Sequence, residues 1–390
     1  MTRAQPTPSA GLRILVLDLD DVLIQQVAYH QSLKDCVAMV GRWCGFPAVQ
    51  LSDEDVAVFE AQGVTSEWDS SAICAALLLE RAWQMDPGRT LPDSPSASDG
   101  RLHGLPAPDF QAFFRAAFHG RHSGPEARAE TELRLLGSRE HSPGQTYALQ
   151  LVLRSAYDPS ASLTHRIIQE LNLGAATFEA CYGVPAALPG PGYLNTIDPP
   201  LISPETSAKL TAWRAAPGTR AVVFTNRPSM MPHGPGGTPE AEIGLERVGL
   251  SALPFIAMGH LDWLAAQRGL EPQSLLKPSS VHVLAALRRA AGDELVEALD
   301  GAARLGLDQV DDGSWRRLDG AHATVFDDSF RGLHSAREAQ VTLESIDVRV
   351  TIDLRGVTTL AAKREALEAA GGTVYPDFVT AARPVLDRAT

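Results

Sequence analysis

Apolar runs that end abruptly in polar side chains are the clearest pattern along this chain. The first run, over residues 13–24, carries three carboxylates near its end, Asp18, Asp20 and Asp21. A run of this length is typical of a strand buried on both faces, where unpaired carboxylates are too costly to bury. The acids are therefore expected at the carboxyl end of the strand, where open α/β sheets bind ligands. The local pattern also fits an acidic loop that only ends a strand.

Two later apolar runs, over residues 220–228 and 323–329, end in the same way. Both are rich in β-branched and aromatic residues, as strands are. Their polar residues are Thr225, Asn226 and Arg227 in the first run and Asp327 and Asp328 in the second. Lys277 lies between the two runs, ahead of a helix predicted over residues 281–287. Because parallel strands place their ends at one edge of a sheet, these side chains are expected to converge.

The spacing of the runs predicts two domains. The interval 26–200 is far longer than a parallel crossover requires, so it is expected to form a domain inserted into a core made of residues 1–25 and 201–390. Helices are predicted in this interval at 29–44, 52–62, 70–84, 108–119, 145–156 and 162–173. The predicted fold is α/β, a Rossmann-like parallel sheet core with a large, mostly α-helical domain inserted after the first strand.

Four weaker expectations concern the remaining segments. Mobile stretches are expected near 92–108 and 120–144, which are rich in Pro, Gly and polar residues. Residues 348–352 and 360–370 are interpreted as the last strand and helix of the core. The segment 293–318 is interpreted as an extra surface element to which the sequence assigns no function.

Composition excludes several classes of protein. The net charge of −13 over 390 residues argues against binding to nucleic acid or to an anionic membrane surface. The four cysteines show no Cys-x-x-Cys spacing, so they indicate neither a zinc site nor a disulfide framework. The first residues do not resemble a secretory signal, and no apolar run approaches the length of a membrane span. We therefore expect a cytoplasmic protein; the sequence does not indicate its oligomeric state.

Lysine usage provides an independent indication. The chain has four lysines, Lys34, Lys209, Lys277 and Lys363, and otherwise uses arginine. The compact charge of a lysine suits contact with a single phosphoryl or carboxylate oxygen. Lys277 fits that role, although its retention by chance fits equally well.

Taken together, the polar segments resemble the motifs of the haloacid dehalogenase-like superfamily of phosphotransferases. Residues 18–22 match its first motif, Asp-x-Asp-Gly-(Thr/Val), Thr225 matches the second and Lys277 the third. Residues 327–333 look like the acidic fourth motif of β-phosphoglucomutase-like and phosphoglycolate phosphatase-like members, which form subfamily I with an inserted helical cap. All four occur in the family's order. One departure is Asp21, which replaces the usual glycine and leaves the geometry of that loop open.

The resemblance implies a Mg²⁺-dependent phosphatase acting on a small phosphorylated metabolite. Asp18 would attack phosphorus to form an aspartyl-phosphate, and Asp20 would act as the general acid and then the general base. Thr225 would donate a hydrogen bond to a phosphoryl oxygen, and Lys277 would offset the negative charge.

The same resemblance implies a site for Mg²⁺ built from oxygen ligands. The expected ligands are Asp18, the backbone carbonyl of Asp20, and Asp328 with help from Asp327. In the family, an insertion after the first strand forms a cap over the active site, and that is the role implied for residues 26–200.

Four more residues are candidates for binding substrate. Asn226 and Arg227 follow the second strand directly, so contacts to phosphate or to the leaving group are expected, although Arg227 also fits a surface ion pair. Glu67 and Trp68 belong to a polar loop that resembles the Asn-Asn-Asp-Trp loop of an uncharacterised branch of the superfamily. The competing interpretation is helix capping by Ser66 or Asp69, with Trp68 packed in a core.

Other functions remain open at this point. A phosphomutase of the β-phosphoglucomutase type would share the fourth motif, and an inactive phospho-ligand-binding relative would share the fold. A dehalogenase has no use for the second carboxylate, Asp20. A receiver-like signalling module has a similar set of acids, but it is much shorter.

Overall fold

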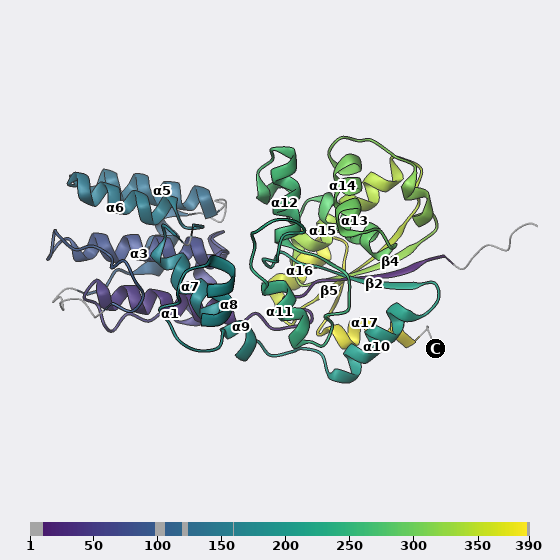
Figure 1. Cartoon of the computed structure of the whole chain (residues 1–390), viewed down its shortest axis with the longest axis horizontal. Coiled ribbons are helices and arrows are strands. Elements are labelled where there is room, and N and C mark those ends of the chain that lie inside the picture. The colour runs from purple at the N-terminus through teal and green to yellow at the C-terminus, as the bar shows by residue number, and fades with distance from the viewer. Residues whose placement is uncertain (1–10, 98–105, 119–123, 159, 388–390) are drawn as a thin grey trace, which may run out of the picture. The chain divides into compact units, whose positions relative to one another are not determined.

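The computed structural model describes residues 11–97, 106–118, 124–158 and 160–387. Its contacts divide the chain into two compact units (Figure 1). The first unit consists of residues 1–26 and 199–390, and the second of residues 27–198.

The first unit is built on a six-stranded sheet in which every pair of neighbouring strands is parallel, in the order β3-β2-β1-β4-β5-β6. The strands are β1 (Arg13–Leu17), β2 (Thr219–Phe224), β3 (Phe255–Ile256), β4 (His322–Asp327), β5 (Thr351–Val357) and β6 (Thr373–Tyr375). A parallel sheet needs helical crossovers, and the chain supplies them between successive strands. The predicted Rossmann-like α/β class is therefore confirmed.

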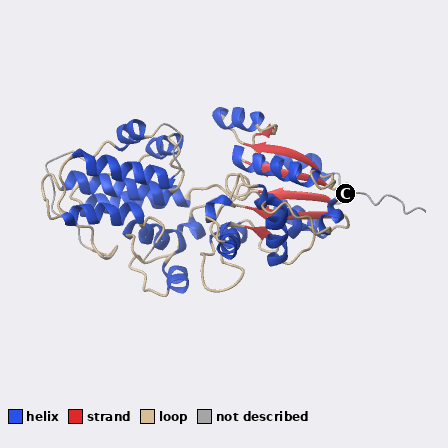
Figure 2. Cartoon of the chain, turned by 90° about the horizontal axis from the view of Figure 1, so that it is seen from above, coloured by secondary structure: helices blue, strands red, loops and turns tan. Residues whose placement is uncertain are grey.

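Helices cover both faces of this sheet (Figure 2). In β1, Ile14 and Val16 belong to the core on one face, whereas Leu15 and Leu17 belong to the core on the other. The helices on the first face are α12 (Met258–Arg268), α13 (Ser280–Ala290), α14 (Leu295–Gly306) and α15 (Phe330–Glu344). The opposite face is covered by α10 (Pro204–Ala215), α11 (Glu240–Arg247) and α17 (Phe378–Leu386). Burial on both sides explains why β1 appears in the sequence as an unbroken apolar run.

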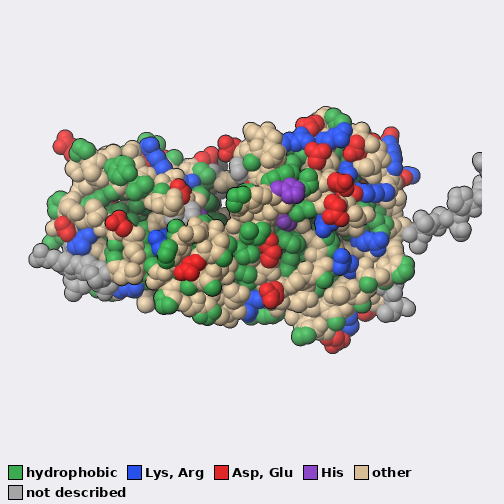
Figure 3. Space-filling view, viewed as in Figure 1, with side chains coloured by type: hydrophobic (Ala, Val, Ile, Leu, Met, Phe, Trp, Pro, Cys, Tyr) green, Lys and Arg blue, Asp and Glu red, His purple; other side chains and the backbone are tan. Residues whose placement is uncertain are grey.

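The interpretation of residues 293–318 as a surface element is wrong. The segment forms α14 and a short 3₁₀ helix, η2 (Ser314–Leu318), and its Leu299, Trp315 and Leu318 are fully buried in the core under β1. Its exposed side carries acidic and basic side chains (Figure 3), and Leu307 and Val310 are also exposed. In the sequence, the polar residues of this segment make it hard to recognise the apolar positions that pack against α13.

The expected end of the core is also wrong. After β5 and α16 (Ala361–Ala369), the chain adds the edge strand β6 and the helix α17. A strand of three residues is too short to show a periodic pattern in the sequence.

The second unit is helical in its described residues. Its helices are α1 (Ala28–Trp43), α2 (Asp53–Ala61), α3 (Glu67–Ala82), α4 (Phe110–Ala117), α5 (Gly124–Ser138), α6 (Pro143–Arg154), α7 (Leu163–Leu173), α8 (Ala175–Tyr182) and α9 (Tyr193–Thr196). Ser52 and Ser142 begin α2 and α6 with capping boxes, in which the serine and the third helical residue satisfy each other's backbone groups. Most residues of α3 are buried, so this helix lies at the centre of the unit.

All six predicted helices are present, but the stretch expected to be mobile over 120–144 contains α5. Its buried residues, Ala127, Thr131 and Leu135, recur every four positions and form a narrow stripe in an otherwise charged helix. So narrow a stripe is easily missed in a sequence. Residues 98–105 of the other stretch, and residues 119–123 of this one, lie outside the described residues. None of the helices in the described parts of the chain is both long and apolar enough to span a bilayer.

Two buried histidines make the stability of the first unit depend on pH. Burial, assisted by the charge of Lys277, lowers the pKa of His282 from 6.5 to about 3, and burial assisted by the charge of Arg289 lowers that of His260 from 6.5 to about 4. Below pH 6.5 the unfolded chain takes up protons that the folded chain refuses, so the free energy of unfolding decreases as the pH falls. We expect His282→Gln to lessen this decrease by about 1 kcal/mol per pH unit between about pH 6 and pH 5.

Urea denaturation followed by circular dichroism at several pH values measures this slope. His322→Gln, at an exposed position at the start of β4, is the matched control and should retain the parent slope. Equal slopes for His282→Gln and the parent would contradict the expectation.

Candidate functional site

The site begins where β1 ends between its two partners. Leu17 pairs with Val223 of β2 on one side and with Phe326 of β4 on the other. The next residue, Asp18, donates its backbone N–H to the carbonyl of Phe326 at 2.9 Å, so it lies beside Asp327. Parallel pairing in this register brings the ends of three strands to one place, as the sequence predicts.

Lys277 connects the acids at this edge. Its Nζ lies 2.8 Å from Oδ1 of Asp18 and 2.7 Å from Oδ2 of Asp327, and 3.9 Å from the ring centroid of Phe224 below it. Burial by itself lowers the pKa of this ammonium group, but the two carboxylates outweigh burial and raise the pKa to about 12. Lys277 therefore stays charged, and its backbone N–H is held by the amide oxygen of Asn226 at 3.3 Å.

Asp327 has the surroundings of a positioning residue. It is fully buried, and its Oδ1 accepts hydrogen bonds from the backbone N–H of Ser329 at 2.9 Å and from the Ser329 hydroxyl at 2.6 Å. A Cβ atom at Gly332 would lie only 1.7 Å from Oδ2 of Asp327, so the first turn of α15 requires glycine there. The serine and glycine of the fourth motif thus hold Asp327 against Lys277.

Three carboxylates face one another at this point. Asp18, Asp327 and Asp328 each direct one oxygen to a place where the three oxygens lie within 4.8 Å of one another. Burial raises the pKa of Asp18 well above its usual range, with the charge of Asp327 adding to it and Lys277 opposing it. Burial likewise raises the pKa of Asp328 to about 6. Such a cluster favours a cation that relieves the mutual repulsion of the acids.

Arg227 holds the second acid of the first motif. Its Nε lies 2.7 Å and its Nη2 2.6 Å from Oδ1 of Asp20. Arg227 is only 2% exposed, so this ion pair is not on the surface. Its backbone N–H donates to the hydroxyl of Thr225 at 3.1 Å, and Thr225 is fully buried. The side chain of Asp20 is thus directed to an arginine, whereas the cluster that could hold a metal ion consists of Asp18, Asp327 and Asp328.

Asp21 adopts a backbone conformation that glycine reaches most easily. Its φ of +53° lies in the left-handed region, which aspartate tolerates better than most residues. Its Oδ1 accepts a hydrogen bond from the backbone N–H of Gln26 at 3.2 Å. The aspartate therefore fits the turn and places a carboxylate at its outer side.

Lys363 is a site residue that the sequence interpretation missed. It lies in the first turn of α16, and its Nζ contacts Oδ2 of Asp328 and lies 3.7 Å from Oδ2 of Asp21. The sequence did contain a signal, because Lys363 is one of only four lysines in the chain. Nothing in its local sequence distinguishes it from an ordinary helical surface lysine.

The charges of the site do not balance. Five carboxylates face three cations, which leaves a formal excess of two negative charges when every group is ionised. The carboxylates are Asp18, Asp20, Asp21, Asp327 and Asp328, and the cations are Arg227, Lys277 and Lys363. One divalent cation would restore balance.

Glu67 and Trp68, predicted to bind substrate, belong to the second unit. Trp68 packs against the core of that unit and stacks on His165, with 5.5 Å between ring centroids. Glu67 lies 3.9 Å from His30, and Asp69 is buried in an ion pair with Arg128. Ser66 makes no side-chain capping bond. The core packing of Trp68 is thus observed, whereas a role of either residue in substrate binding stays a prediction.

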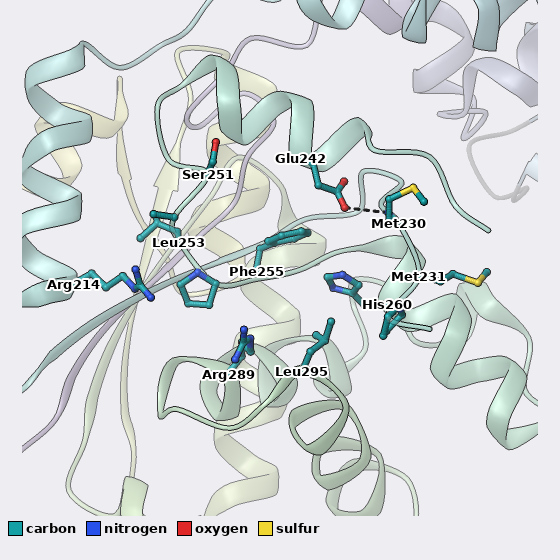
Figure 4. A pocket seen from close by; sticks show the side chains of 13 residues that line it. Arg214, Met230, Met231, Glu242, Ser251, Leu253, Phe255, His260, Arg289 and Leu295 are labelled. Atoms are coloured by element: carbon teal, nitrogen blue, oxygen red, sulfur yellow. Dashed lines mark hydrogen bonds between the residues drawn. The ribbon is translucent and has the colours of Figure 1, made fainter. Parts of the chain in front are cut away.

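A pocket of about 450 Å³ in the first unit lies apart from this chemistry (Figure 4). It is lined by Phe255, His260 and the two methionines that follow the second motif, and Arg214 and Arg289 border it. Its lining contains none of the carboxylates of the site. The pocket adjoins the loop after Arg227, and its lining includes Glu242 and His260 but no residue of the carboxylate cluster.

Comparisons with known proteins identify the fold and no family. No protein-family model and no curated protein matches the chain. An X-ray structure of Northeast Structural Genomics Consortium target ZR25 is similar with a TM-score of 0.63 and 17% identity, over 97% of this chain and 98% of that chain. Phosphatase Tt82 from Thermococcus thioreducens is similar with a TM-score of 0.43 and 12% identity, over 91% of this chain and 99% of that one. At 17% identity, the likeness to target ZR25 concerns the fold alone.

The backbone at Asp21 leads to a stability prediction. Asp21→Gly and Asp21→Ala both remove the carboxylate, but only alanine keeps a Cβ in the left-handed region. We expect the alanine variant to unfold with a free energy about 1 kcal/mol lower than the glycine variant. Urea denaturation of the two variants measures the difference, and equal stability would show that the turn does not require this conformation.

Proposed function

We propose that this chain is a Mg²⁺-dependent phosphatase that hydrolyses a small phosphorylated metabolite through an aspartyl-phosphate on Asp18. The observation that supports it most is the position of Lys277, which contacts both Asp18 and Asp327 beside the carboxylate of Asp328. Phosphoryl transfer to an aspartate needs a buried carboxylate, a charged group beside it and acids that can hold a metal ion. Asp18, Lys277 and the pair Asp327 and Asp328 provide such groups.

Mg²⁺ fits the donor set and the charge of the site. Asp18 and Asp328, with the backbone carbonyl of Asp20, would hold it by oxygen ligands, and Asp327 would position its neighbours. The formal excess of two negative charges equals the charge of one such ion. When bound, the ion would neutralise part of the charge on a phosphate ester, so that a carboxylate can approach phosphorus.

In the proposed reaction, the carboxylate of Asp18 attacks phosphorus and the bond from phosphorus to the leaving oxygen breaks. Lys277 stabilises the negative charge that spreads over the phosphoryl oxygens, and Thr225 donates a hydrogen bond to one of them. Water then attacks the aspartyl-phosphate, which releases inorganic phosphate and restores Asp18.

Asp20 is the proposed acid and base, and Arg227 sets its position. As a general acid, Asp20 donates a proton to the departing oxygen; as a general base, it takes one from the attacking water. The two contacts from the Arg227 guanidinium hold the side chain of Asp20 in a fixed position. The acid step requires Asp20 to leave this ion pair, so we assign Arg227 a positioning role and not the phosphate contact expected from sequence.

Replacing the nucleophile tests the proposal. We expect the parent protein to release phosphate from a chromogenic phosphate ester in the presence of Mg²⁺, and Asp18→Asn to lower kcat at least about 1,000-fold, because an amide cannot replace the carboxylate. Asp300→Asn, at an exposed aspartate that pairs with Arg268, is the control and should retain activity. Removal of Mg²⁺ with a chelator should abolish activity, and its return should restore it.

Full activity of Asp18→Asn, or activity unaffected by chelation, would rule out this mechanism. A panel of sugar phosphates, nucleotides and phospho-acids identifies the substrate class. On that panel, isomerised sugar phosphate with little free phosphate would instead show a phosphomutase.

A further inference from the structure

Lys363 contacts one of the carboxylates that the proposed metal would use, Asp328. Its Nζ contacts Oδ2 of Asp328, whose side chain is 12% exposed. The lysine reaches this oxygen from solvent, since its own side chain is 42% exposed. A carboxylate that contacts an ammonium group binds a divalent cation less tightly, because the two positive charges repel each other at this short separation.

Asp21 offers the ammonium group a second position. Its Oδ2 lies 3.7 Å from Nζ of Lys363, and its side chain is 41% exposed. The left-handed backbone of residue 21 and the bond from Gln26 hold this carboxylate at the outer side of the site. A short movement of the flexible lysine side chain would therefore exchange Asp328 for Asp21 without leaving the ammonium group unpaired.

We propose that Lys363 is a tethered cation that occupies Asp328 when no metal is bound, and that Asp21 receives its ammonium group when Mg²⁺ binds. This inference rests on the proposed function for the identity of the metal. The exchange keeps the acidic cluster neutralised in both states, and it lowers the affinity for metal because each binding event must first displace the lysine. Asp21 reduces that cost, which gives a physical reason for an aspartate at a position where glycine fits the backbone more easily.

Equilibrium titration with Mg²⁺ alone, followed by calorimetry, tests the competition without any substrate. We expect Lys363→Met to bind Mg²⁺ roughly threefold to tenfold more tightly than the parent, because the competing cation is gone. Lys209→Met is the matched control, since Lys209 forms an exposed pair with Glu205 in α10, and its affinity should equal that of the parent. Lys363→Gln, which keeps a polar side chain, should behave like Lys363→Met.

A double-mutant cycle tests the role of Asp21. Asp21→Asn should weaken Mg²⁺ binding more in the parent than in Lys363→Met, because only the parent has a lysine that needs a second partner. Additive effects would overturn the exchange and leave only a general influence of charge. If Lys363→Met binds Mg²⁺ no more tightly than Lys209→Met, the competition is overturned. If the parent still binds Mg²⁺ in that case, the proposed function is unaffected. No binding of Mg²⁺ by any variant would overturn both.

Discussion

The need to neutralise buried carboxylates governs this site. Asp18 and Asp327 lie at the ends of adjacent parallel strands, where the sheet brings them together whether or not their charges favour it. Lys277 makes this possible by contacting both. Arg227 and Lys363 do the same for the acids further out, so each carboxylate of the site has a cation beside it. The remaining excess of negative charge is what a divalent cation would satisfy.

Much of the local sequence serves to hold these groups in place. Ser329 and Gly332 position Asp327 at the start of α15, and Asn226 fixes the backbone of Lys277 from the end of β2. The contact between Asn226 and Lys277 joins positions that are 51 residues apart in the chain. Residues that looked like candidates for contacting substrate, Asn226 and Arg227 among them, are observed to bind other site residues. Sequence motifs of this kind therefore combine reactive groups with the residues that orient them.

The errors of the sequence interpretation have a common cause. α5 has a narrow apolar stripe in a charged helix, and α14 buries its apolar side under a polar exterior. In both, the few buried positions can be recognised only when the partner surface is known, because tertiary packing and not local propensity stabilises such helices. The three-residue strand β6 is an extreme case, since it exists only as an edge of a sheet that is already formed.

The sequence by itself determined the strand ends that carry Asp18, Thr225 and Asp327, because a strand buried on both faces must be apolar until it reaches the edge of the sheet. It also determined the order of the reactive residues and most of the helices. Only the tertiary structure decided which cation pairs with which acid. That choice depends on distances of a few ångströms between side chains from separate elements, as with Lys363 and Asp328, and no pattern along the chain encodes such distances.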